Sequence, residues 1–368
     1  MKFVVALTAL SLLSSVSTAA LAAAPHQRVE VTFVLDTTGS MADLIEGAKK
    51  KIWSIASTIV DTNPEADIAM ALVAYRDRGD DYVVQTTPLS EDIQGLYAKL
   101  VKLQADGGGD TPESVNEALD KAVSGLQWTS GDNVKHIVFL VGDAPPHMDY
   151  EQERQYPEIL AIAADKHIIV NAVQAGDMAE TTPTWKVIAQ FGHGRYIAIP
   201  QSGGQVTIII TPFDDEILRI QQQLDQSVVP YGNEERKADT TARMAEKSAS
   251  ADSIKIDNSK YYSKRSITKE VITGGGDLVA DVRNKKIDLG EIKDEELPDE
   301  LKAKPSAARQ VWLDERLKQR SELEAKMAAL IAKRDAFVLA ESKKSAAPKT
   351  ADSFDGVVED TLRLQLKY

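Results

Sequence analysis

Up to about residue 200, short and nearly continuous apolar runs alternate with longer segments in which apolar residues recur at helical spacing. A short apolar run is typical of a strand buried on both faces, and apolar residues three and four apart indicate an amphipathic helix. Strands are predicted at residues 29–35, 68–75, 82–88, 135–141, 167–173 and 195–199, and helices at 43–60, 91–103, 113–126, 151–165, 184–191 and 206–226. This alternation predicts an α/β fold: a Rossmann-like, doubly wound and mostly parallel sheet with helices on both faces. The strand at 82–88 is expected at an antiparallel edge, because only the short connection 76–81 precedes it.

The pattern changes after Pro200. Residues 206–226 are expected to form a helix that packs back on the sheet and closes the first domain. Further along, a polar helix or linker is predicted at 233–253, a short strand at 278–282, a helix starting at 297–300, and a terminal helix at 354–366. The expected organisation is therefore a signal peptide at 1–22, an α/β domain at 27–227, a linker and mixed α/β region at 228–305, and a mainly helical C-terminal region at 306–368.

Residues 306–342 form the strongest helical stretch of the second half. Five of their apolar residues fall on a heptad seam, which Arg316, Arg320 and Arg334 interrupt: Leu313, Leu323, Met327, Leu330 and Phe337. Two interpretations stay open, an amphipathic helix that packs within its own chain and a dimerising coiled coil.

Two of the predicted buried strands end on an acid, and hydroxyl residues gather nearby. Asp36 ends the first strand and is followed by Thr38 and Ser40, Asp143 ends the strand at 135–141, and the glycine-rich loop 107–114 offers Thr111. Ligands of open α/β sheets bind at the carboxyl ends of the strands. Carboxylate and hydroxyl oxygens suit hard cations such as Mg²⁺ and Mn²⁺. For Asp36 alone, a helix N-cap is the simpler explanation, but the three segments together favour a metal site.

These three segments resemble the metal-ion-dependent adhesion site (MIDAS) of the von Willebrand factor type A (vWA) family. The resemblance covers residues 29–200, and it departs from the family at Thr38, where serine is usual. Threonine keeps the hydroxyl, so coordination should survive. The resemblance implies Mg²⁺, or Mn²⁺ or Ca²⁺, held by the five residues above, with an acidic residue of a protein partner completing the coordination. Candidate partner contacts beside the metal loops are Gly109, Asp110 and His147.

Composition places the chain among exported proteins. Lys2, an apolar core at 3–13 and the small residues up to Ala22 are typical of a signal peptide, so a periplasmic or secreted location is expected. Similar tails follow A-type domains in exported bacterial proteins, without an assigned activity. The 368 residues include no cysteine, so an exported chain would depend on its core, a metal or partners for stability.

The acidic balance, 56 Asp and Glu against 43 Lys and Arg, argues against nucleic acid as a partner. After the predicted signal peptide, no segment has the length of apolar sequence that a membrane span needs. A homo-oligomer is possible on this evidence, through the helical stretch at 306–342.

The sequence leaves two other functions to consider. The C-terminal helices could make the chain an assembly scaffold that is indifferent to metal. The segment around Asp36 also distantly resembles the phosphorylation motif of phosphoaspartate enzymes, but the second acid expected two residues later is replaced by Thr38. No nucleophile and base pair for acyl transfer was found either. We therefore expect a binding protein and not an enzyme.

Overall fold

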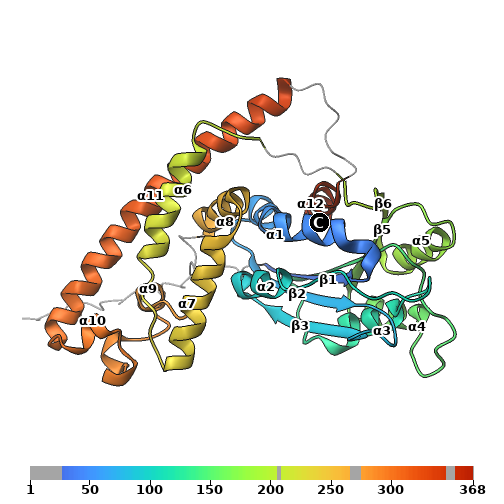
Figure 1. Cartoon of the computed structure of the whole chain (residues 1–368), viewed down its shortest axis with the longest axis horizontal. Helices are drawn as coiled ribbons and strands as arrows, with labels where there is room; N and C mark the ends of the chain where they lie inside the picture. Colours follow the sequence, from blue (N-terminus) through green and yellow to red (C-terminus); the bar gives the residue numbers. More distant parts are fainter. Residues whose placement is uncertain (1–26, 205–208, 266–274, 345–352, 368) are drawn as a thin grey trace, which may run out of the picture.

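A computed structural model describes residues 27–204, 209–265, 275–344 and 353–367. The predicted signal peptide lies outside the described residues, and so do residues 345–352 of a polar linker that the sequence predicts at 342–352. Six strands form one sheet in the order β3-β2-β1-β4-β5-β6 (Figure 1). They are β1 (Arg28–Asp36), β2 (Asp67–Tyr75), β3 (Val84–Ser90), β4 (Val134–Gly142), β5 (Ile168–Ala175) and β6 (His193–Ile199). Neighbouring strands run parallel except β2 and β3, which are antiparallel as expected for the edge strand.

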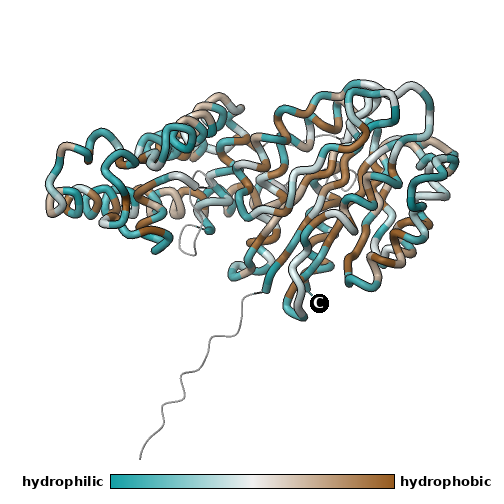
Figure 2. The backbone as a smooth tube through the Cα atoms, turned by 90° about the horizontal axis from the view of Figure 1, so that it is seen from below, coloured by the Kyte–Doolittle hydropathy of each residue, from teal (hydrophilic) through white to brown (hydrophobic). Residues whose placement is uncertain are grey.

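Helices cover both faces of the sheet, as predicted. One core cluster joins the sheet to α1 (Ala42–Thr62), α2 (Ile93–Leu100) and α12 (Phe354–Gln365). The other joins it to α3 (Val115–Asp120), which continues as a π-helical turn at Lys121–Gly125, and to α4 (Tyr156–Asp165) and α5 (Thr181–Phe191). Figure 2 shows hydrophobic residues gathered along the strands between these layers. The central strands are apolar on both sides because helices bury both faces.

The order of the strands places β1 beside β4. The chain moves outward from β1 to β2 and β3 on one side, and from β4 to β5 and β6 on the other. Leu35 pairs with Val141, so Asp36 and Asp143 leave the sheet at neighbouring positions. This is a topological switch point, the place at the carboxyl ends of the strands where open α/β sheets commonly bind ligands.

The terminal helix α12 belongs to the packing of the sheet although it lies far along the chain. The Phe354 ring lies 6.3 Å from that of Phe33 on β1, and Val358 and Leu362 are fully buried in the same cluster. Polar contacts add to this: Gln365 donates to Asn171 of β5 at 2.8 Å, and Glu359 accepts from Ser54 of α1 at 2.6 Å.

Helix α6 (Asp214–Gln226) does not pack on the sheet, and that expectation is wrong. Its buried residues Ile217, Ile220 and Leu224 cluster instead with α8 (Asp252–Arg265) and α11 (Ser306–Lys344). Residues 206–208 of the predicted helix lie outside the described part. In Figure 1, α6 and α11 lie side by side in a helical part that projects away from the sheet.

The remaining elements of this helical part are α7 (Glu234–Ala249), α9 (Leu278–Arg283), α10 (Asp299–Lys302) and two 3₁₀ turns at Leu289–Glu291 and Asp294–Glu296. The short strand predicted at 278–282 is wrong, because these residues form α9. Asp277 caps that helix by accepting from the Val279 N–H at 3.3 Å. It also pairs with the buried guanidinium of Arg320, which ties α11 to this region.

The long helix α11 uses its apolar residues within the chain. Leu313 packs with α9 and α10, while Met327, Leu330 and the partly buried Leu323 pack with α6. The Phe337 ring lies 6.3 Å from that of Phe213. All five residues of the heptad seam thus have partners in the same chain, as the amphipathic-helix interpretation requires. Within the described residues, no helix combines the length and apolar character of a membrane span.

Candidate metal centre

The turn after β1 holds Asp36, Thr38 and Ser40 together. The Oδ1 atom of Asp36 accepts from the Thr38 N–H at 2.9 Å and from the Thr38 hydroxyl at 2.7 Å. The hydroxyls of Thr38 and Ser40 lie 3.3 Å apart. Thr37 anchors the turn to β2, because its N–H and hydroxyl both donate to the carbonyl of Tyr75. Three of the five predicted ligands therefore form one connected group.

Asp143 lies beside this group. A Cβ atom built at Gly142 would lie 3.1 Å from Oδ2 of Asp36, which shows how closely the end of β4 approaches that carboxylate. Oδ2 of Asp143 accepts from the side-chain amide of Gln201 at 2.6 Å, and the same amide reaches the Ser40 carbonyl at 3.2 Å. Gln201, which follows β6, thus bridges the two predicted metal-binding loops, and no sequence pattern had indicated it.

The glycine-rich loop approaches the β1 turn closely. Gly107 accepts from the Gly39 N–H at 3.2 Å, and Gly108 N–H donates to Asp80 at 3.1 Å. Both glycines have positive φ, 78° and 85°. A side chain at Gly107 would overlap the Asp80 carboxylate. Glycine is therefore needed here for backbone conformation and for space.

Thr111 is not brought to the group. It is exposed on the glycine-rich loop, and no described contact links it to Asp36 or Asp143. The residue that the loop turns inward is Glu113, which is buried. Its N–H donates to the Pro145 carbonyl at 2.9 Å and fixes the loop against the segment after β4. Sequence reasoning missed Glu113, although it is the acid of the same loop motif.

Several buried acids gather at this end of the sheet. Burial, with a contribution from the nearby Asp143, raises the pKa of Asp36 to about 7. Burial and the surrounding acids Asp36, Asp77, Asp80 and Asp143 raise the pKa of Glu113 to about 9. Among the described residues, Asp36 Oδ2 and Glu113 Oε2 are buried atoms without a hydrogen-bond partner. A cation bound between these oxygen atoms would supply the partner that the two buried atoms lack, so the residues fit a divalent metal.

The raised pKa values predict that the metal-free protein loses stability as the pH rises. In the fold, Asp36 stays protonated up to about pH 7 and Glu113 up to about pH 9, whereas in the unfolded chain both are ionised above about pH 4. Stability falls with rising pH wherever the native state binds more protons. In Glu113→Gln, the contribution of Glu113 to this pH dependence of stability is absent. We expect the unfolding free energy of the variant, relative to that of the wild type, to increase from pH 5 to pH 9 in urea titrations without metal. A difference that stays constant over this range would contradict the assignment.

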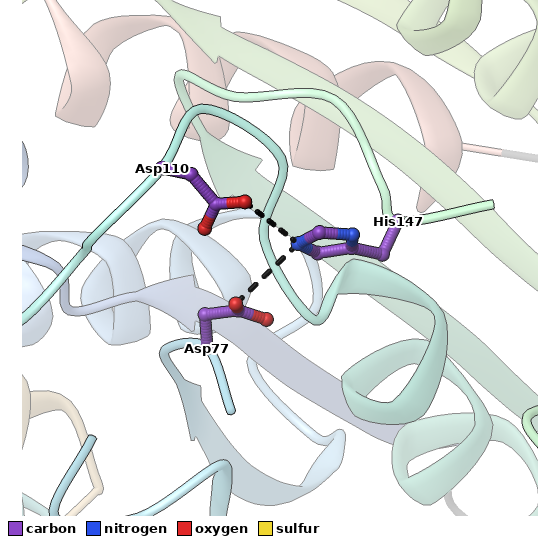
Figure 3. A group of neighbouring side chains, drawn as sticks. All are labelled: Asp77, Asp110 and His147. Atoms are coloured by element: carbon purple, nitrogen blue, oxygen red, sulfur yellow. Dashed lines mark ion pairs between the residues drawn. The ribbon is translucent and has the colours of Figure 1, made fainter. Parts of the chain in front are cut away.

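The three residues predicted to contact a partner occupy the outer loops. Gly109 and Asp110 are exposed on the glycine-rich loop, and His147 is buried on the β4–α4 connection, 7% exposed. His147 and Asp110 lie together with Asp77, which follows β2 (Figure 3). The sequence did not indicate Asp77, because a single acid in a loop of several charged residues cannot be recognised as a functional residue from the sequence.

Comparison with known protein families supports the vWA domain. The von Willebrand factor A domain family model matches residues 30–211. These residues form a von Willebrand factor A domain. No relative among those below resembles the chain over its whole length.

Two curated relatives match parts of this domain. One is an ariadne-like RING finger protein of Acanthamoeba polyphaga mimivirus, 31% identical over 121 residues, which are 32% of this chain and 11% of that protein. The other is von Willebrand factor A domain-containing protein 7 of Rattus norvegicus, 36% identical over 96 residues, which are 25% of this chain and 10% of that protein. The match thus spans about a tenth of the length of these relatives.

Among solved structures, the SpRpn10 VWA domain is 12% identical with a TM-score of 0.36, and the aligned part covers 48% of this chain and 89% of that one. BatB from Bacteroides thetaiotaomicron is 17% identical with a TM-score of 0.34, covering 47% of this chain and 90% of that one.

Proposed function

We propose that this protein binds a divalent cation, Mg²⁺ or the related Mn²⁺ or Ca²⁺, at a MIDAS and through it an acidic residue of a protein partner. The vWA domain suggests a role in protein interaction. The ligands are those predicted from the sequence: Asp36, Thr38, Ser40, Thr111 and Asp143. The observation that carries the proposal is the buried Asp36 carboxylate, which has an oxygen without a partner and lies beside a second acid.

The chemistry of these residues explains why a partner acid would be bound. Asp36 and Asp143 supply two negative charges, and Thr38 and Ser40 supply neutral hydroxyls. A divalent cation with few anionic ligands retains affinity for a further carboxylate. Ser40 is exposed, so the site opens to solvent. Thr111 would join through a bridging water or after a shift of its loop. Export to the periplasm or beyond stays a prediction from residues 1–22.

A carboxylate that completes the coordination can be detected without knowing the partner. With Mn²⁺ bound to the protein, water-proton relaxation reports the water molecules on the ion. We expect acetate to lower this signal in a saturable way, because it replaces metal-bound water. Acetamide, which has nearly the same shape and no charge, should have little effect. Equal effects of the two would contradict the proposed carboxylate binding.

Substitutions at Thr38 test the one departure from the family pattern. Thr38→Ser keeps the hydroxyl, so the Mg²⁺ affinity should stay within about twofold of the wild type. Thr38→Val has a similar shape but no oxygen ligand, and its buried position leaves little room for a replacement water. We expect its affinity to fall about tenfold or more, a loss of about 1.4 kcal/mol. Calorimetric titration of both variants measures the difference, and equal affinities would remove Thr38 from the site.

A further inference from the structure

We propose that Asp77, Asp110 and His147 form a second cation site, selective for a transition metal such as Zn²⁺, next to the MIDAS. The three residues come from three different loops at the carboxyl edge of the sheet. One potential ligand atom from each lies within 4.8 Å of the other two. Figure 3 shows both carboxylates directed at the same ring nitrogen of His147. This proposal does not depend on metal binding at Asp36.

The protonation of the His147 ring is the main argument. Its Nδ1 atom lies 2.8 Å from Oδ1 of Asp149. An ionised carboxylate only accepts hydrogen bonds, so Nδ1 carries the proton and a neutral ring has its lone pair on Nε2. That Nε2 atom is buried and has no hydrogen-bond partner among the described residues. It faces Oδ2 of Asp77 at 3.4 Å and Oδ2 of Asp110 at 3.9 Å. A cation between these three electron-rich atoms would stabilise their arrangement.

The surroundings hold the ring and one carboxylate in place. A metal-bound histidine typically donates its other nitrogen to a carboxylate, as His147 does to Asp149. The His147 ring stacks on that of Tyr150 with centroids 4.0 Å apart and an angle of 11°. Asp77 accepts from the Ser114 hydroxyl at 2.8 Å and from the Tyr150 hydroxyl at 3.1 Å. Such outer contacts preorganise a metal site.

The donor set determines the kind of metal. Imidazole nitrogen with two carboxylates suits Zn²⁺ and its neighbours, whereas Mg²⁺ prefers oxygen alone. Zinc bonds of about 2.0–2.1 Å in a tetrahedron place ligand atoms ~3.4 Å apart. The separation of His147 and Asp77 already has this value. The Asp110 oxygen lies 3.9 Å from Nε2 of His147, and its side chain is 65% exposed, so it is free to move closer. Three protein ligands leave a fourth position open to solvent.

A protonated imidazolium could occupy the same space without any metal. Its extra proton would sit on Nε2 between the two acids. The Arg78 guanidinium also lies near this site, over the Tyr150 ring at 3.8 Å from its centroid, and pairs with Glu153 at 2.7 Å. Zinc titration distinguishes the two arrangements, because only the metal site binds zinc saturably.

The experiment is a calorimetric titration of the metal-stripped full chain with Zn²⁺ in excess Mg²⁺, which occupies the site at Asp36. The wild type should bind one equivalent. Asp110→Asn, at an exposed position where folding is not at risk, should weaken zinc binding at least tenfold, and His147→Gln should abolish it. The matched control is Asp81→Asn, which removes the same charge from an exposed position on the nearby β2–β3 loop and should bind as the wild type does.

Several results would overturn the proposal. Absence of saturable zinc binding in the wild type would exclude the site, and equal binding by Asp110→Asn would show that the zinc sits elsewhere. The Asp36→Asn variant separates the two sites: it should lose Mg²⁺ and keep zinc. If it lost both, the loops would form one site and not two.

Discussion

The Asp36→Asn variant is expected to lose stabilisation by Mg²⁺ altogether while its fold remains intact. In the wild type, Mg²⁺ at a hundred times its dissociation constant should add about 2.7 kcal/mol to the free energy of unfolding. Asparagine has the shape of aspartate and can still accept from the Thr38 N–H and hydroxyl. It lacks the negative charge that a divalent cation requires, so the variant should gain nothing from the metal.

The same substitution should raise stability when no metal is present. A carboxyl with an ordinary pKa of 3.8 that is raised to about 7 by burial costs the ionised fold on the order of 4 kcal/mol at pH 8. Asparagine avoids this cost but must leave its own N–H groups without full pairing. We expect a net gain of ~2 kcal/mol for metal-free Asp36→Asn at pH 8.

Thermal or urea unfolding at pH 8, with and without Mg²⁺, measures both effects. Asp67→Asn serves as the matched control, because Asp67 begins β2 at the opposite end of the sheet. It should respond to Mg²⁺ as the wild type does. An Asp36→Asn protein that Mg²⁺ stabilises as strongly as the wild type would exclude Asp36 as a ligand.

The second large effect is expected at the terminal helix. Leu362→Ala removes a fully buried side chain from the cluster that α12 shares with α1 and the sheet. Such substitutions cost about 2–5 kcal/mol, because packing is lost and a cavity remains. Leu364 lies on the same helix but is 47% exposed, so Leu364→Ala should change stability by less than about 0.5 kcal/mol.

Urea denaturation of the two variants tests whether α12 is part of the vWA core. A large loss for Leu362→Ala and almost none for Leu364→Ala is the expected result. Similar small losses in both would mean that the helix does not pack on the sheet in solution. Below its unfolding transition, Leu362→Ala should still bind Mg²⁺, because the residue lies in the core and not in the metal loops.

The local pattern of apolar and polar residues predicts much of the domain. Buried parallel strands give apolar runs, and the acids that end two of them, Asp36 and Asp143, mark the carboxyl edge of the sheet. The connected group of Asp36, Thr38 and Ser40 follows from the same signal, since alternate residues of a tight turn project to one side. These features depend on short stretches of sequence, so they can be recognised without the tertiary structure.

Other features depend on contacts between distant segments. The apolar spacing of Phe354, Val358 and Leu362 indicates a buried face but does not say that its partner is the sheet. Likewise, Ile217 and Leu224 indicate an amphipathic helix, and only the tertiary structure shows that α11 covers it. The apolar run at 278–282 is typical of a strand, but Asp277 caps these residues as a helix.

The candidate site shows the same division. Sequence spacing could not tell that Glu113 turns inward while Thr111 is exposed, because the direction of each side chain depends on the contact of the loop with Pro145. Gln201 reaches Asp143 from another part of the chain, and Asp77 meets His147 only because three loops converge. Such groupings arise from topology and leave no local mark.

Calorimetric titration of the metal-stripped protein with Mg²⁺ tests the central claim most directly, with Asp36→Asn measured beside it. The account predicts one saturable site in the wild type and no binding heat in the variant. Saturable binding of equal strength in both proteins would contradict it, since the cation would then be held by residues other than the acid at the end of β1.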